Sequence, residues 1–138
     1  MRVASYNAKL GLPETGLGLI PGYGGTQRLA RLVGHGRAFE MIATASMIEA
    51  DRAHEMGLVN HVFTSDELMS KTIELAKKMT RNSPSALRSA IRSINAGYQV
   101  GVDGFKVEIE EFGKCFGTAD FKEGTTAFLE KRKPSFNA

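Results

Sequence analysis

The chain has 138 residues, of which 42% are hydrophobic and 24% charged, and this balance excludes a disordered or fibrous protein. Eighteen basic residues against 15 acidic ones leave a formal net charge of +3, too mild to imply nucleic acid or an anionic membrane surface as a partner. The single cysteine excludes an internal disulfide framework. With no apolar run near the ~18 residues of a transmembrane helix and no secretion-signal pattern, we expect a cytoplasmic protein.

Strands and helices are both predicted in the first part of the chain. Loose alternation of apolar and polar residues over residues 1–12 predicts short strands. A glycine-rich turn then leads into a helix that we expect Thr26 to cap and Gly34 to end. The further predicted elements are helices over residues 36–45 and 49–56 and an extended segment over residues 58–63.

Only helices are predicted after residue 63, so we expect two parts, residues 1–63 and residues 64–138. The first helix of the second part begins at a capping box from Thr64 to Glu67, and a later one at Ser83 followed by proline. The next helix carries an aromatic stripe, and Thr118 is expected to cap the last. The stripe comprises Phe105, Phe112 and Phe116. Because three large aromatics on one stripe bury much area, we expect this helix to pack on the rest of the chain or on another subunit.

Glu14 is a lone carboxylate between a proline and a run of leucines and glycines, at the start of the segment LPETGLGLIPGYGGTQRL. If it is buried, the loss of water favours its protonated form and suits it to proton transfer. Taken alone, a solvated loop carboxylate is the simpler interpretation. The glycine-rich turn favours a structural role over phosphate binding, because Gln27 stands where a dinucleotide fingerprint needs its third glycine.

Other candidate sites are weaker. Cys115 lies on an apolar stripe and is interpreted as a packed thiol. The three histidines show no zinc-binding spacing, and we expect no metal. The basic triplet at residues 131–133 follows Phe128, so it fits an anionic ligand with an apolar stem, but it fits the dipole of a helix C-terminus equally well.

Four blocks of the sequence, in order along the chain, resemble the C-terminal half of the enoyl-CoA hydratase/isomerase, or crotonase, superfamily. They are NAKLGLPE at residues 7–14, LGLIPGYGGTQRL at 17–29, MGLVN at 56–60 and GTTAFLEKRKP at 124–134. The second block is the most specific, because it is long and fixes four glycines and a proline.

The resemblance implies an α/β fold, the ClpP/crotonase spiral of strand-strand-helix turns, followed by a helical region that forms trimers or dimers of trimers. It also implies acyl-CoA thioester substrates, with no cofactor beyond the coenzyme A that the substrate carries. Glu14 matches one of two catalytic glutamates of the hydratases, the one that handles the proton exchanged with the acyl chain. Phe128 matches an aromatic that leans toward the acyl-CoA pocket of a neighbour, and Lys131 a basic residue that reaches the nucleotide end of CoA.

Two departures qualify this resemblance. In the family, the second glutamate and both oxyanion-hole amides lie upstream of the position of Met1, so we expect this chain alone to be inactive. The family usually has glycine where this chain has Ala45, which leaves the geometry of that helix end open. The first interpretation is the C-terminal half of an enoyl-CoA hydratase. The alternatives are an isomerase or other enolate chemistry, and a non-catalytic module that oligomerises or pairs with a separate N-terminal half.

Overall fold

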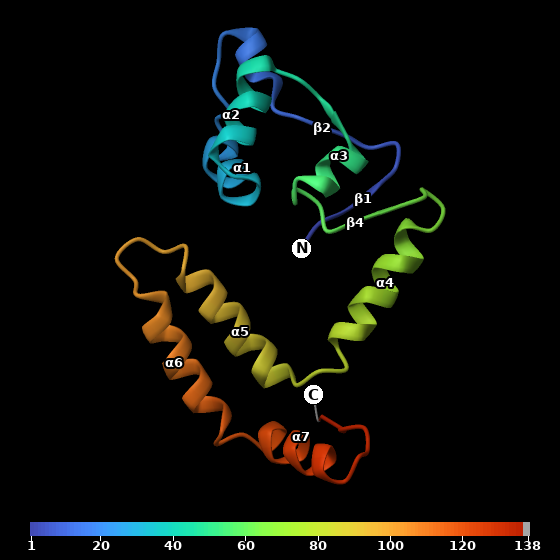
Figure 1. Cartoon of the computed structure of the whole chain (residues 1–138), viewed down its shortest axis with the longest axis vertical. Helices are drawn as coiled ribbons and strands as arrows, with labels where there is room; N and C mark the ends of the chain where they lie inside the picture. Colours follow the sequence, from blue (N-terminus) through green and yellow to red (C-terminus); the bar gives the residue numbers. More distant parts are fainter. Residues whose placement is uncertain (137–138) are drawn as a thin grey trace. The chain divides into compact units, whose positions relative to one another are not determined.

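The computed structural model of the chain describes residues 1–136, which are mostly helical and form two compact units (Figure 1). The first unit, Met1–Glu74, holds all four strands of the described residues, and the division falls within α4. Its elements are β1 (Val3–Ser5), β2 (Lys9–Leu10), the 3-10 helix η1 (Pro13–Leu17), α1 (Gly25–Val33), α2 (His35–Thr44), β3 (Ile48–Glu49), α3 (Ala50–Glu55) and β4 (His61–Phe63). The later elements are α4 (Leu68–Met79), α5 (Pro84–Ala96), α6 (Gly104–Cys115) and α7 (Ala119–Leu129).

The strands form two separate pairs. β1 runs parallel to β4, with Val3 opposite His61, and β2 runs antiparallel to β3, with Lys9 opposite Glu49. Arg2 lengthens the first pair, because its carbonyl accepts from the Asn60 amide at 2.7 Å. Pairs this short are only marginally stable alone. The first unit therefore depends on the helices that pack beside its strands.

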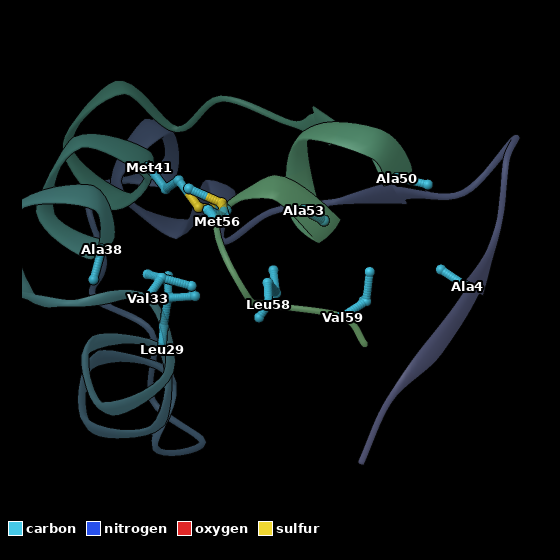
Figure 2. Close-up of a cluster of buried hydrophobic side chains, with 10 residues drawn as sticks. All are labelled: Ala4, Leu29, Val33, Ala38, Met41, Ala50, Ala53, Met56, Leu58 and Val59. Atoms are coloured by element: carbon cyan, nitrogen blue, oxygen red, sulfur yellow. The ribbon is translucent and has the colours of Figure 1, made fainter. Parts of the chain in front are cut away.

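A single cluster of small and medium-sized side chains forms the core of the first unit (Figure 2). Leu29 and Val33, four residues apart on α1, face this cluster as the helical spacing predicts. Leu32, on the same helix, is 41% exposed. The core residues are Ala4, Leu29, Val33, Ala38, Met41, Ala50, Ala53, Met56, Leu58 and Val59.

The second unit packs α5 against α6 through polar and small residues instead of aromatic ones. Ser89, Ala96 and Glu111 are buried, whereas Phe105 and Phe112 are 81% and 65% exposed. The predicted aromatic stripe exists, but the described residues of the chain leave most of it exposed. The ring of Phe112 meets the ring of Phe116 edge-on, with centroids 5.0 Å apart, and the Phe116 ring contacts that of Phe121 at 4.8 Å.

Two of the predicted helix caps are confirmed. The Ser83 hydroxyl accepts from the Ala86 amide at 3.0 Å, and the Thr118 hydroxyl accepts from the Phe121 amide at 3.1 Å. Thr26 does not cap α1, so that prediction is wrong. Gly24 occupies the N-cap position of α1 with φ 81°, a conformation that glycine adopts readily and threonine does not.

The predicted capping box takes a different form. The Thr64 hydroxyl donates to Glu67 Oε2 at 2.8 Å, so the two side chains bond to each other. A hydrogen bond with Thr64 also lowers the pKa of Asp66. The polar cluster still lies just before α4, which begins one residue after Glu67.

Candidate active site

Glu14 lies in η1, a short 3-10 helix that its own sequence favours. Pro13 fits the first helical position because it needs no amide donor there, and Gly18 ends the turn in the left-handed conformation at φ 75°. The Leu19 amide donates to the Glu14 carbonyl at 3.1 Å. The Thr15 hydroxyl donates to the Ile42 carbonyl on α2. The backbone around Glu14 is therefore fixed against the helices of the first unit.

The side chain of Glu14 has an unusual environment. Within residues 1–136, its Oε2 atom is buried and has no hydrogen-bond partner. A buried polar atom without a partner costs free energy, and native proteins satisfy most such atoms. This oxygen is therefore available to a group outside the described residues.

The glycines near Glu14 are required by close packing. A Cβ on Gly25 would lie 2.8 Å from the Pro21 Cβ and 3.0 Å from a methyl carbon of Leu12. A Cβ on Gly11 would lie 2.5 Å from the Met47 sulfur. These contacts hold the segment that leads into Glu14, which supports the structural interpretation of the glycine-rich turn.

Phe128 and Lys131 lie together at the end of α7, in the second unit. Phe128 is 82% exposed, and its carbonyl accepts from the Lys131 amide at 3.2 Å. The Arg132 amide donates to the Ala127 carbonyl at 3.0 Å, and Lys131 has φ 54°. This is the Schellman ending of a helix, with lysine where glycine is usual.

The Glu123 carboxylate, on α7, forms hydrogen bonds with the segment that follows this turn. Arg132 Nη1 and Nη2 donate to Glu123 Oε1 and Oε2 at 2.7 and 2.9 Å, and the Ser135 amide donates to Oε1 at 2.7 Å. The bond from Arg132 lowers the pKa of Glu123 to about 2. Sequence reasoning missed Glu123, although it immediately precedes the block GTTAFLEKRKP that contains Phe128 and Lys131.

The other group with a strongly lowered pKa joins α5 to α6. Glu111 is only 5% exposed, and it accepts from Arg92 Nε at 2.8 Å and from Lys114 Nζ at 2.7 Å. The bonds from Arg92, then Lys114 and Ser89, lower the pKa of Glu111 to about 2. These contacts connect the two helices, so we assign Glu111 a role in stability.

The remaining candidates are accounted for by local contacts. The Cys115 thiol donates to the Glu111 carbonyl at 3.3 Å, His54 Nδ1 lies 3.3 Å from the Val59 carbonyl oxygen, and the His61 ring stacks on Phe63. Among the described residues, no three His, Cys, Asp or Glu side chains are grouped to hold a metal ion. In the same part of the chain, no helix has both the length and the apolar character needed to cross a membrane.

The structure thus brings Phe128 and Lys131 together and describes Glu14 separately, in the other unit. The short strand pairs, the proline–glutamate turn and the run of helices define a fold of the crotonase class. A family model for enoyl-CoA hydratase/isomerase matches residues 1–138. The chain belongs to the enoyl-CoA hydratase/isomerase family.

Individual relatives agree with this assignment. A Short-chain-enoyl-CoA hydratase of Clostridium acetobutylicum is 50% identical over 134 residues, which cover 96% of this chain and 51% of the relative. A Crotonyl-CoA hydratase of Syntrophomonas wolfei is 47% identical, with 98% and 52% covered. The crystal structure of an enoyl-CoA hydratase from Bacillus anthracis matches with a TM-score of 0.92 at 45% identity, with 99% of this chain and 53% of that chain covered. The chain spans about half the length of these three proteins.

Proposed function

We propose that this chain supplies Glu14 to the active site of an enoyl-CoA hydratase in acyl-CoA metabolism in the cytoplasm. In that reaction the hydroxyl group of water adds to C3 of a 2-enoyl-CoA and a proton adds to C2, giving a 3-hydroxyacyl-CoA. Glu14 donates the proton that adds to C2, and it removes this proton in the reverse reaction. The observation that carries the proposal is the buried Glu14 Oε2 atom, which lacks a partner among the described residues and lies on an anchored turn.

The remaining catalytic groups come from another segment of polypeptide. They are a second glutamate, which orients the attacking water, and two backbone amides that stabilise the thioester oxyanion. Loss of a single oxyanion donor typically costs about 10² to 10³ in rate. This chain alone is therefore inactive. The reaction needs no metal or redox cofactor, and coenzyme A enters as part of the substrate.

Phe128 and Lys131 bind the coenzyme A portion of the substrate in this proposal. An exposed aromatic ring offers a face to the ligand, and an ammonium group suits a phosphate. Residues 1–63 then form the catalytic part, and residues 64–138 form the part that oligomerises, as a trimer or dimer of trimers. The uncovered rings of Phe105 and Phe112 support such an assembly.

A hybrid protein tests this function. The N-terminal half of the C. acetobutylicum relative, joined to this chain, supplies the proposed missing groups. We expect the hybrid to hydrate crotonyl-CoA, measured as loss of the absorbance of the conjugated thioester, with 3-hydroxybutyryl-CoA as product. Glu14→Gln lowers kcat by about 10² or more, the usual contribution of a general acid or base. Glu40→Gln, an exposed site on α2, is the matched control and leaves kcat unchanged.

Each failure of this experiment has a distinct meaning. A product with a shifted double bond and no hydration, from a longer enoyl-CoA, would show an isomerase. Equal activity of the Glu14→Gln and Glu40→Gln hybrids would remove Glu14 from the reaction. A well-folded, oligomeric hybrid with no activity on any enoyl-CoA would favour a non-catalytic module.

A further inference from the structure

The segment that follows α7 is held against that helix by one carboxylate. Glu123 accepts two hydrogen bonds from the Arg132 guanidinium, at 2.7 and 2.9 Å, and a third from the Ser135 amide at 2.7 Å. Its side chain is only 25% exposed. The Phe136 ring lies over Gly124, where an added Cβ would be 3.5 Å from a ring carbon. The chain that follows the turn at Lys131 is thus anchored to α7, the helix that precedes it.

That turn places Lys131 in a conformation that side chains rarely adopt. Lys131 has φ 54°, whereas most of the other left-handed positions in residues 1–136 are glycines. An L-residue in this conformation is strained, and such strain persists only where the surrounding structure enforces it. The bonds of Glu123 to Arg132 and Ser135, which lie on the C-terminal side of Lys131, provide that enforcement.

The same contacts distinguish two cations of the basic triplet, Arg132 and Lys131. Arg132 pairs with both Glu123 and Glu130, so its charge is compensated. Lys131 is exposed, and its backbone bonds to the carbonyl of Phe128. Arg132 therefore stabilises the turn, whereas the exposed Lys131 ammonium group can bind a ligand.

We propose that Glu123 is a positioning residue: by holding Arg132 and Ser135 it keeps Lys131 in its left-handed turn beside Phe128, ready to contact a phosphate of coenzyme A. This inference rests on the proposed function for the ligand. The turn itself is a property of the protein without ligand, so the two parts can be tested separately.

The first measurement uses no ligand. In the full chain, the coupling between the amide and α protons of Lys131 reports its φ angle, and hydrogen exchange of the Arg132 amide reports the bond to Ala127. We expect Glu123→Gln to change the coupling and to speed the exchange about tenfold or more. Arg132→Met removes the guanidinium group that pairs with Glu123 and should have the same two effects. Glu110→Gln, at an exposed position on α6, removes one negative charge elsewhere and should change neither value.

The second measurement is the affinity of the same variants for coenzyme A. We expect Lys131→Met and Glu123→Gln each to weaken binding about two- to fivefold, the size of one exposed charge contact. The double variant should bind no more weakly than either single variant, because both changes remove the same contact. A variant that merely destabilised α7 would instead weaken binding further when the two changes are combined.

The outcomes separate the two proposals. Unchanged coupling and exchange at the turn in Glu123→Gln would overturn the positioning role whatever the ligand does. Additive losses in the double variant would overturn it too. If wild type does not bind coenzyme A, or if Lys131→Met binds it as well as wild type, the ligand assignment fails, and the measurement at the turn still decides whether Glu123 holds Lys131.

Discussion

Ala45 ends α2 in the left-handed conformation, with φ 52° and ψ 25°. Its amide donates to the Ile42 carbonyl at 3.3 Å, which closes the last turn of the helix. Glycine is the usual residue at such an end because it has no Cβ to clash with the backbone. Ala45 therefore adopts the left-handed conformation that glycine favours at the end of a helix. We predict that Ala45→Gly stabilises the protein.

The size of this effect follows from three terms. Relief of the left-handed strain contributes about 1–2 kcal/mol. Glycine loses about 0.5–1 kcal/mol more conformational entropy on folding than alanine. Removal of a half-buried methyl group costs about 0.4 kcal/mol, half the value for a fully buried one. With the middle of each range, the net gain in the free energy of unfolding is about 0.4 kcal/mol.

Urea unfolding, with Ala43→Gly as the matched control, measures this gain. Ala43 lies in the same helix, is exposed and has ordinary helical neighbours, so its change to glycine should destabilise by about 1 kcal/mol. The two identical substitutions, two residues apart, are thus predicted to have opposite signs. If Ala45→Gly destabilises as much as Ala43→Gly, the strain assigned to Ala45 does not exist.

The remaining predictions concern the ion pairs, the caps and the glycine-rich turn. Because the pKa of Glu111 is about 2 against an ordinary 4.5, its stabilisation is present above pH 4.5 and is lost as the pH falls toward 2. Glu111→Gln should lower Tm at pH 7 and reduce its dependence on pH between 2 and 5; an unchanged Tm profile would contradict this. Thr118→Ala should cost about 1 kcal/mol in urea unfolding, and Thr26→Ala, which removes no cap, much less. Gly25→Ala should displace Leu12 and with it the Glu14 turn, so kcat of the hybrid enzyme should fall while Gly36→Ala, in open space, leaves it unchanged.

Local signals predicted most of the secondary structure and several of its ends. The Ser83 and Thr118 caps were predictable because a hydroxyl that bonds an amide three residues later is encoded within one turn. The Thr26 cap failed because two competing signals were adjacent. Gly24 could adopt φ 81° and take the N-cap position itself, one residue before the helix begins.

Contacts between distant residues could not be predicted. Amphipathic spacing identified the aromatic stripe with Phe105 and Phe112. Spacing defines only a face, however, and the described residues leave most of this face exposed. The hydrogen bonds between Glu123 and Arg132 join residues nine positions apart, on either side of a left-handed turn at Lys131. Nothing in the sequence requires lysine to adopt that turn. Glu14 was identified through resemblance, and only the structure revealed that one of its oxygens is buried without a partner.

The proton transfer assigned to Glu14 is the central claim, and it can be measured without the addition of water. Butyryl-CoA has no double bond to hydrate, but the hybrid enzyme should exchange its C2 hydrogen with deuterium in D₂O, because the proposed base removes and returns that proton. We expect mass spectrometry to show exchange with the wild-type hybrid and at least a 10²-fold slower rate with Glu14→Gln. Exchange at the wild-type rate in the Glu14→Gln hybrid would contradict the account.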